Sequence, residues 1–132
     1  MDITLVEGPE NYHSWFLNIK GSVPKDLWKY FDPESADEYN PPETVTFTTI
    51  RSEATTWQQL SAAELELYVQ LHTLYHFYLS QYQRYLTEEA KLRTTLLNTV
   101  PEIMRCLLPI DESIRQWISN LQVALRTIRR PT

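Results

Sequence analysis

The sequence has 132 residues, of which 42% are hydrophobic and 22% charged, and a formal net charge of −5. A chain of this size and composition fits a single globular domain, and we expect one domain over residues 1–132. Two glycines are too few for a glycine-rich phosphate loop. A single cysteine excludes an internal disulfide framework or a cysteine-rich metal site.

The charge is unevenly distributed along the chain. Residues 1–60 hold ten acidic and four basic residues, a net charge of −6, and residues 61–132 hold seven and eight, a net charge of +1. Phosphate binding requires a basic surface, so direct nucleic-acid binding by this chain is not expected. The first residues lack the pattern of a signal peptide, and no stretch has the length of a membrane span. We therefore expect a cytoplasmic protein without membrane contact.

Two short helices are predicted near the start of the chain. Tyr12, Trp15 and Ile19 follow one another at helical spacing after Asn11, which can cap a helix. Gly21 and Pro24 end this first helix. A second helix begins at Pro24, presents Trp28 and Tyr30, and stops at Pro33.

Residues 33–56 are predicted to form an extended, proline-rich, acidic loop. Three prolines lie among acidic residues there, a composition typical of loops. The alternating run Thr44–Ile50 would suit a short strand, but the sequence offers no second strand to pair with it. We expect an extended segment, with Phe47 or Ile50 packed against the core.

A long helix is predicted over residues 61–98. Ser61 and Glu64 form a capping-box pattern, and no proline or glycine follows until after Asn98. Such a helix would measure about 57 Å at 1.5 Å per residue, against about 30 Å for a small domain, so it should project, bend or break. Thr87-Glu88-Glu89 offers a capping-like restart, and we place a break there.

Two apolar rows at alternating spacings of three and four run along this helix. The "tyrosine row" is Tyr68, Leu71, Tyr75, Tyr78, Tyr82 and Tyr85, and the "histidine row" is Leu65, Val69, His72, His76 and Leu79. Such spacing suits a coiled-coil seam, but a central helix covered on two sides would show it too, and we favour that interpretation.

The C-terminal part is predicted to contain two more helices. One lies between Pro101 and Pro109, where Cys106 is expected to be buried. The other begins near Asp111 and carries a clean apolar face. The chain is therefore predicted to be all-α, a compact bundle of about five helices around one long central helix. The positions expected to define its core are Trp15, Ile19, Trp28, Tyr30, Trp117 and Leu121.

No catalytic or cofactor site is predicted. His72 and His76 project from one helical face, as zinc ligands do, but a local third ligand is missing and His13 could join only through tertiary contact. Packing histidines are the favoured interpretation, and a metal protein is the least favoured alternative. Trp57, just before the capping box, could anchor the long helix.

One resemblance carries a functional expectation. The pattern Leu5-x-x-Gly8-Pro9-Glu10-Asn11-Tyr12-x-x-Trp15-x-x-x-Ile19, followed by Leu27-Trp28-x-Tyr30-x-Asp32-Pro33, resembles the opening of Gag (capsid) proteins of copia-type (Ty1-like) retrotransposons. The segment Ile114-Arg115-Gln116-Trp117-x-x-x-Leu121 is similar to the region after that family's long helix. The zinc knuckle and the second helical half of such proteins are missing.

The resemblance implies a non-enzymatic domain that associates weakly with itself or with related Gag chains in a virus-like particle. In that case Trp15, Ile19, Trp28 and Asp32-Pro33 would define the fold. The alternative is a domesticated Gag-derived module that binds or regulates other proteins. Candidate assembly surfaces are the exposed part of the tyrosine row, the last helix and the acidic loop; the residues are Tyr68, Tyr75, Tyr82, Ile118 and Leu125.

Overall fold

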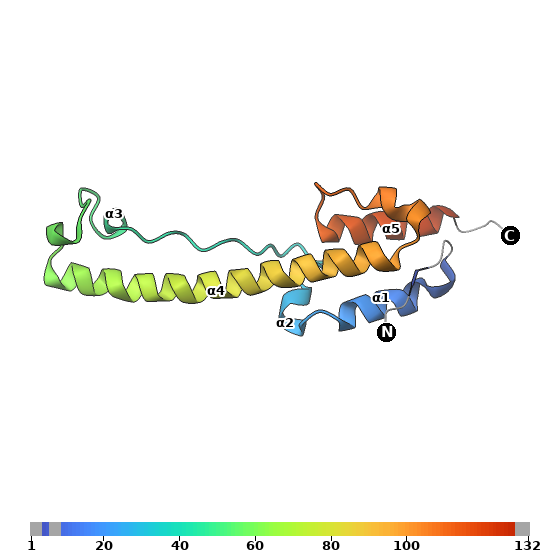
Figure 1. Ribbon diagram of the computed structural model, residues 1–132, viewed down its shortest axis with the longest axis horizontal. Helices are drawn as coiled ribbons and strands as arrows, with labels where there is room; N and C mark the ends of the chain where they lie inside the picture. The colour runs from blue at the N-terminus through green and yellow to red at the C-terminus, as the bar shows by residue number, and fades with distance from the viewer. Residues whose placement is uncertain (1–3, 6–8, 129–132) are drawn as a thin grey trace. The chain divides into compact units, whose positions relative to one another are not determined.

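The computed structural model describes residues 4–5 and 9–128, and the described part is helical, as the sequence predicts. Figure 1 shows its α-helices: α1 (Tyr12–Gly21), α2 (Lys25–Trp28), α3 (Phe47–Ile50), α4 (Ala62–Thr99) and α5 (Ile114–Ile128). Three 3₁₀ helices accompany them: η1 (Pro9–Asn11), η2 (Trp57–Gln59) and η3 (Glu102–Leu107). The chain divides into two compact units, Met1–Glu38 with Leu86–Thr132 (unit 1) and Tyr39–Tyr85 (unit 2). The expectation of one domain over residues 1–132 stays a prediction.

Unit 1 is a small helical bundle around the C-terminal part of α4. Helices α1 and α5 both pack against this part of α4, through Trp15 and Trp117 respectively (Figure 1). The indole Nε1 of Trp15 donates to Oγ1 of Thr99 at 2.9 Å, and the backbone N–H of Leu5 donates to the carbonyl of Thr99. Trp15 and Thr99 are both buried, so this bond satisfies two polar groups inside the core.

Helix α5 closes unit 1 through its apolar face. Ile114, Trp117, Ile118, Leu121 and Leu125 are all buried, as the regular spacing predicts. The Trp117 indole Nε1 donates to the carbonyl of Pro109, and the Arg93 guanidinium lies 4.7 Å from the centre of the Trp117 ring. These contacts fix the connection before α5 and hold α5 against α4.

A polar clamp holds the segment after α2 onto α5. The guanidinium of Arg115 donates from Nε to the carbonyl of Asp32 at 3.0 Å and from Nη2 to the carbonyls of Lys29 and Asp37. Hydrogen bonds from a charged donor are stronger than neutral ones, so these three bonds hold residues 29–37 against α5.

Unit 2 consists of residues 39–60, here called the covering segment, and the N-terminal part of α4. The Phe47 ring lies 4.7 Å from that of Tyr68, and the Tyr39 ring stacks on that of Tyr85 at 4.9 Å. The covering segment therefore runs antiparallel to the helix and binds it through aromatic pairs.

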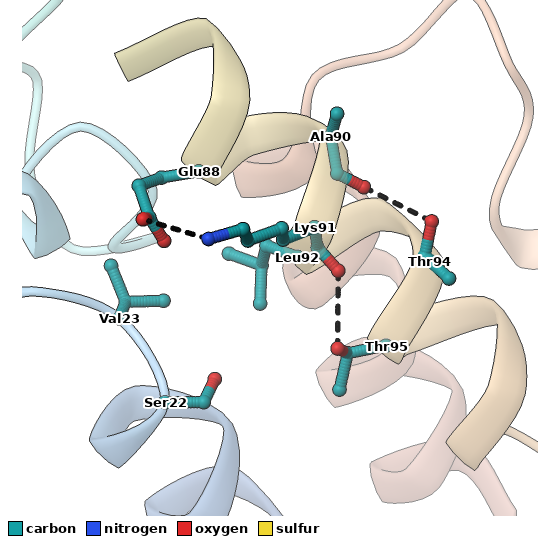
Figure 2. Close-up of a pocket in the computed structure, with 8 residues that line it drawn as sticks. All are labelled: Ser22, Val23, Glu88, Ala90, Lys91, Leu92, Thr94 and Thr95. Carbon is teal, nitrogen blue, oxygen red and sulfur yellow. Dashed lines mark hydrogen bonds and ion pairs between the residues drawn. The ribbon is translucent and has the colours of Figure 1, made fainter. Parts of the chain in front are cut away.

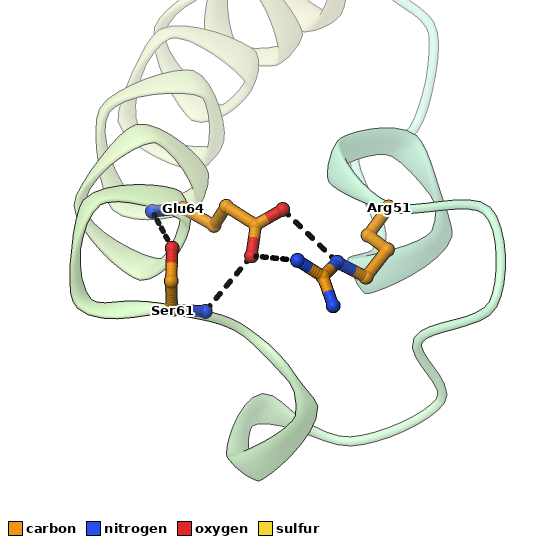
Figure 3. Close-up of polar contacts among 3 residues, drawn as sticks. All are labelled: Arg51, Ser61 and Glu64. Atoms are coloured by element: carbon orange, nitrogen blue, oxygen red, sulfur yellow. Dashed lines mark hydrogen bonds and ion pairs between the residues drawn. The ribbon is translucent and has the colours of Figure 1, made fainter.

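The capping box at the start of α4 has formed as predicted. The Glu64 backbone N–H donates to Oγ of Ser61, and the Ser61 backbone N–H donates to Oε1 of Glu64 (Figure 3). Arg51 of the covering segment adds two contacts to the same carboxylate, at 3.1 and 3.0 Å. The Ser61 backbone N–H, followed by Arg51, holds the pKa of Glu64 below its usual range.

Two predictions about these elements are wrong, and one holds in part. Helix α4 continues through Thr87 without a break, because the residues around it are ordinary helix formers that retain every backbone N–H. The loop at residues 33–56 is present as predicted, except that Phe47–Ile50 form a helical turn. Thr46 and Thr49 cap that turn reciprocally, which favours a helical over an extended backbone there.

The other wrong prediction concerns Cys106, which is exposed rather than buried. It lies in η3, where residues three apart share an edge. Ile103 occupies the outer edge together with Cys106, while Met104 on another edge is buried.

Candidate functional site

The residues expected to define the core all lie in unit 1. Trp15, Ile19, Trp28, Trp117 and Leu121 are buried, and Tyr30 is half-buried. They support the bundle and, apart from Tyr30, present almost no surface, so we sought a functional site elsewhere on the chain.

The structure separates the five candidate assembly residues into two groups. Ile118 and Leu125 are fully buried in unit 1, so the last helix does not offer them as a surface, in contrast to the sequence prediction. The other three, Tyr68, Tyr75 and Tyr82, are half-buried in unit 2, and they lie beside the covering segment. The tyrosine row therefore serves mainly to hold that segment.

A third apolar row, absent from the sequence prediction, is exposed on α4 in unit 2. We call Leu67, Leu74 and Phe77 the "exposed row"; these residues are 45%, 48% and 57% exposed. They are seven and three residues apart and so share one side of the helix. Their spacing in the sequence is the signal from which this row could have been found. Val69 of the histidine row is exposed as well.

Apolar residues thus lie on more than one side of this part of α4, and a polar stripe with Glu66, Thr73 and Arg84 occupies the remainder. The covering segment packs on the tyrosine row, whereas the exposed row keeps about half of its surface in water. The interpretation of α4 as a helix covered on two sides therefore does not hold for unit 2. The remaining apolar surface is the principal candidate functional site of the described residues.

A shallow groove of about 380 Å³ lies between the covering segment and α4. Tyr39, Pro42 and Val45 line one wall, and Leu71, Leu74, Tyr75 and Tyr78 contribute to the other. Leu74 belongs to both the groove and the exposed row, so the two adjoin each other there, while Asn40 and Glu43 add polar groups to the groove.

A second, more polar pocket of about 550 Å³ lies in unit 1 between Ser22, Val23 and the part of α4 from Glu88 to Thr95 (Figure 2). Lys91 and Glu88 form an ion pair at 3.5 Å there. The hydroxyls of Thr94 and Thr95 each donate to the carbonyl four residues earlier (Figure 2). These hydroxyls are engaged with the helix backbone, which gives them a structural role.

The two histidines of α4 lie side by side. The ring centres of His72 and His76 are 4.5 Å apart, and His76 is exposed. His13 is on α1 in unit 1 and does not belong to this pair. Among the residues that the structure describes, no group of three or more metal-ligating side chains occurs.

Trp57 does not have the predicted anchoring position. It lies in η2 with 56% of its side chain exposed. The capping box, with its link to Arg51, fixes the start of α4 instead.

Comparison with known proteins gives no assignment: no protein family, no curated protein and no solved structure matches the chain. Within the described ranges, none of the helices combines the length and the apolar character needed to cross a membrane.

Proposed function

We propose that this chain is an assembly domain of a retrotransposon-type Gag protein that contributes to capsid-like self-association in the cytoplasm. In this role it acts through protein–protein contacts with copies of itself or related Gag chains, without catalysis or a cofactor. The proposal combines the sequence resemblance of its first 33 residues with the apolar surface of unit 2.

The observation that carries the proposal is the exposed row. Leu67, Leu74 and Phe77 each leave about half of their side chain in water. Burial of apolar surface contributes about 25 cal/mol per Å², so covering these groups favours association. A second copy would offer the same groups, and self-complementary contacts of this kind are the basis of homo-oligomers.

The expected association is weak for a single pair. Three or four half-exposed apolar side chains fall within the class of transient interfaces, which bury less than about 1,200 Å² in total. A shell gains its strength from many such contacts, because each further contact within the assembly is effectively intramolecular. Weak association between two single copies is therefore consistent with assembly into a shell of many copies.

Sedimentation of the metal-free chain tests this proposal. The chain is measured in EDTA from micromolar to near-millimolar concentration, at low and high salt. We expect growth into dimers or larger species that persists at high salt, because the surface is apolar. A strict monomer at every concentration would contradict the proposal and favour the module that binds other proteins.

A double substitution locates the surface. Leu67→Lys with Phe77→Lys puts two charges on the exposed row, and we expect at least about tenfold weaker association, or about 1.4 kcal/mol. The matched control is Ile103→Lys with Ile110→Lys, since both isoleucines are exposed in unit 1. Equal weakening by both pairs would mean that the exposed row is not the interface.

A further inference from the structure

The histidine row carries a second feature with its own chemistry. His72 and His76 are four residues apart on α4, and their rings meet edge to face with 4.5 Å between centres. His72 is half-buried beside Tyr68, and His76 is exposed. Both imidazoles therefore leave the helix on the same side and lie next to each other.

Two histidines at this spacing can supply half of the ligands of a zinc site. Histidines four apart on a helix bind one Zn²⁺ in many zinc proteins. The ion prefers four ligands in a tetrahedron, with zinc–nitrogen distances of about 2.0–2.1 Å. One copy of α4 supplies two of those ligands, so a second pair of imidazoles would complete the set.

The spacing of the histidine row shows how a second copy could supply that pair. Leu74 lies midway between His72 and His76 in the sequence, so an antiparallel helix centred there places His72 opposite the partner's His76. The same register places Val69 opposite the partner's Leu79. Gaps of four and three along the row are those of a coiled-coil seam, in which facing side chains interdigitate.

The charge of unit 2 favours a cation between two copies. The unit holds four glutamates and two arginines, a formal charge of −2; these residues are Glu43, Glu53, Glu64, Glu66, Arg51 and Arg84. Two copies would repel each other weakly, and a divalent cation at their interface offsets part of that repulsion.

We propose that His72 and His76 form half of a tetrahedral Zn²⁺ site that is completed by the same two histidines of a second, antiparallel copy. This inference goes beyond the proposed assembly function and does not depend on it. The histidine row and the exposed row lie on different sides of α4, because Leu67 and His72 are five residues apart, which is about 140° around the helix.

A titration with Zn²⁺ tests the site. The chain is purified without a histidine tag, stripped with EDTA and dialysed, and then sedimentation is measured as ZnCl₂ is added. We expect dimers to accumulate and to saturate at one zinc per two chains. Substituting Co²⁺ should give the intense visible absorption of a tetrahedral site rather than the weak absorption of an octahedral one.

Three variants make the test specific. His72→Ala and His76→Ala should each lower the apparent zinc affinity at least about tenfold, since even outer-shell changes at metal sites have effects of that size. His13→Ala, on exposed His13 of α1, should leave the titration unchanged. His76→Gln provides a second, polar replacement, and circular dichroism confirms that each variant stays helical.

The result that would overturn this inference is binding of one zinc per chain without dimerisation, or zinc-driven dimerisation that survives both alanine substitutions. Failure of the assembly proposal is recognised separately, because association in EDTA does not involve zinc. The Leu67→Lys and Phe77→Lys variant should lose association in EDTA and keep the zinc-dependent step.

Discussion

The two units of this chain differ in how many apolar residues they bury, although both also expose some, such as Ile103 and Ile110 in unit 1. All of the buried apolar side chains that the structure describes belong to unit 1, except for Ala54. Unit 2 instead leaves Leu67, Val69, Leu74 and Phe77 about half exposed. Helices α4 and α5 show the same contrast, because the main apolar face of α5 is buried, whereas the exposed row of α4 in unit 2 stays about half in water.

This contrast suggests that different residues govern folding and association with other chains. Unit 1 holds its own core, so its residues should govern stability. Unit 2 buries little of its apolar surface, so its residues should govern contacts with other chains. The following substitutions are ways to break that division of roles, and each compares a residue of unit 1 with a matched residue of unit 2.

The largest expected effect comes from a pair of tryptophans. Trp15→Ala should lower the free energy of unfolding by about 3–5 kcal/mol, because it empties a fully buried site in unit 1. Trp57→Ala in unit 2 should change it by no more than about 0.5 kcal/mol, since the side chain is largely exposed. Urea denaturation followed by circular dichroism measures both, and similar losses would contradict the division.

A pair of arginines should give a smaller difference. Arg115→Ala removes the clamp on the carbonyls of Lys29, Asp32 and Asp37 and should cost about 1.5–3 kcal/mol in the same denaturation experiment. Arg51→Ala removes an exposed ion pair with Glu64 and should have an effect close to the detection limit. A larger loss for Arg51→Ala would mean that the covering segment contributes more to stability than we infer.

The pH dependence of stability should differ between the units at the alkaline end. Burial raises the pKa of the Tyr12 phenol in unit 1 above its ordinary value of about 10. The contribution of the neutral Tyr12 phenol to folding stability is therefore complete below pH 10. It is lost as pH rises through the folded-state pKa. Tyr12→Phe should reduce the fall in the free energy of unfolding above pH 10, as measured by urea denaturation. If the pH dependence of this free energy stays unchanged, Tyr12 does not contribute to it.

The smallest effect is expected at the acid end, in unit 2. Because the pKa of Glu64 is lowered, its carboxylate contributes to folding stability above about pH 4.3. This contribution is lost as pH falls through the folded-state pKa. Amide hydrogen exchange at Ser61 and Glu64 should therefore accelerate, beyond the intrinsic dependence on pH, as the solution is acidified. Glu64→Gln keeps the capping box but should remove this dependence.

Much of unit 1 was predictable from the sequence, because its signals are local. Periodic apolar residues in α1 and α5 predicted their buried faces, and the capping box predicted the start of α4 within one residue. The prediction failed where it depended on knowing what the apolar face of a helix packs against. Ile118 and Leu125 were predicted as surface candidates, but α5 buries them within unit 1.

The candidate site in unit 2 was predictable only in part. The spacing of Tyr68, Tyr75 and Tyr82 indicated a contact face, but spacing does not reveal whether that face meets the same chain or another one. The covering segment meets it here, through Tyr39, Phe47 and the groove. That the exposed row is left uncovered was not predictable, because spacing alone does not show which of several apolar rows on a helix is covered.

Hydrogen exchange along α4 at two protein concentrations tests the central claim most directly, in EDTA and with mass-spectrometric detection. In dilute solution we expect residues 62–85 to exchange faster than residues 86–99, which belong to unit 1. At near-millimolar concentration residues 62–85 should become protected, because a second copy covers the exposed row. Exchange in residues 62–85 that stays the same at both concentrations would contradict self-association through this surface.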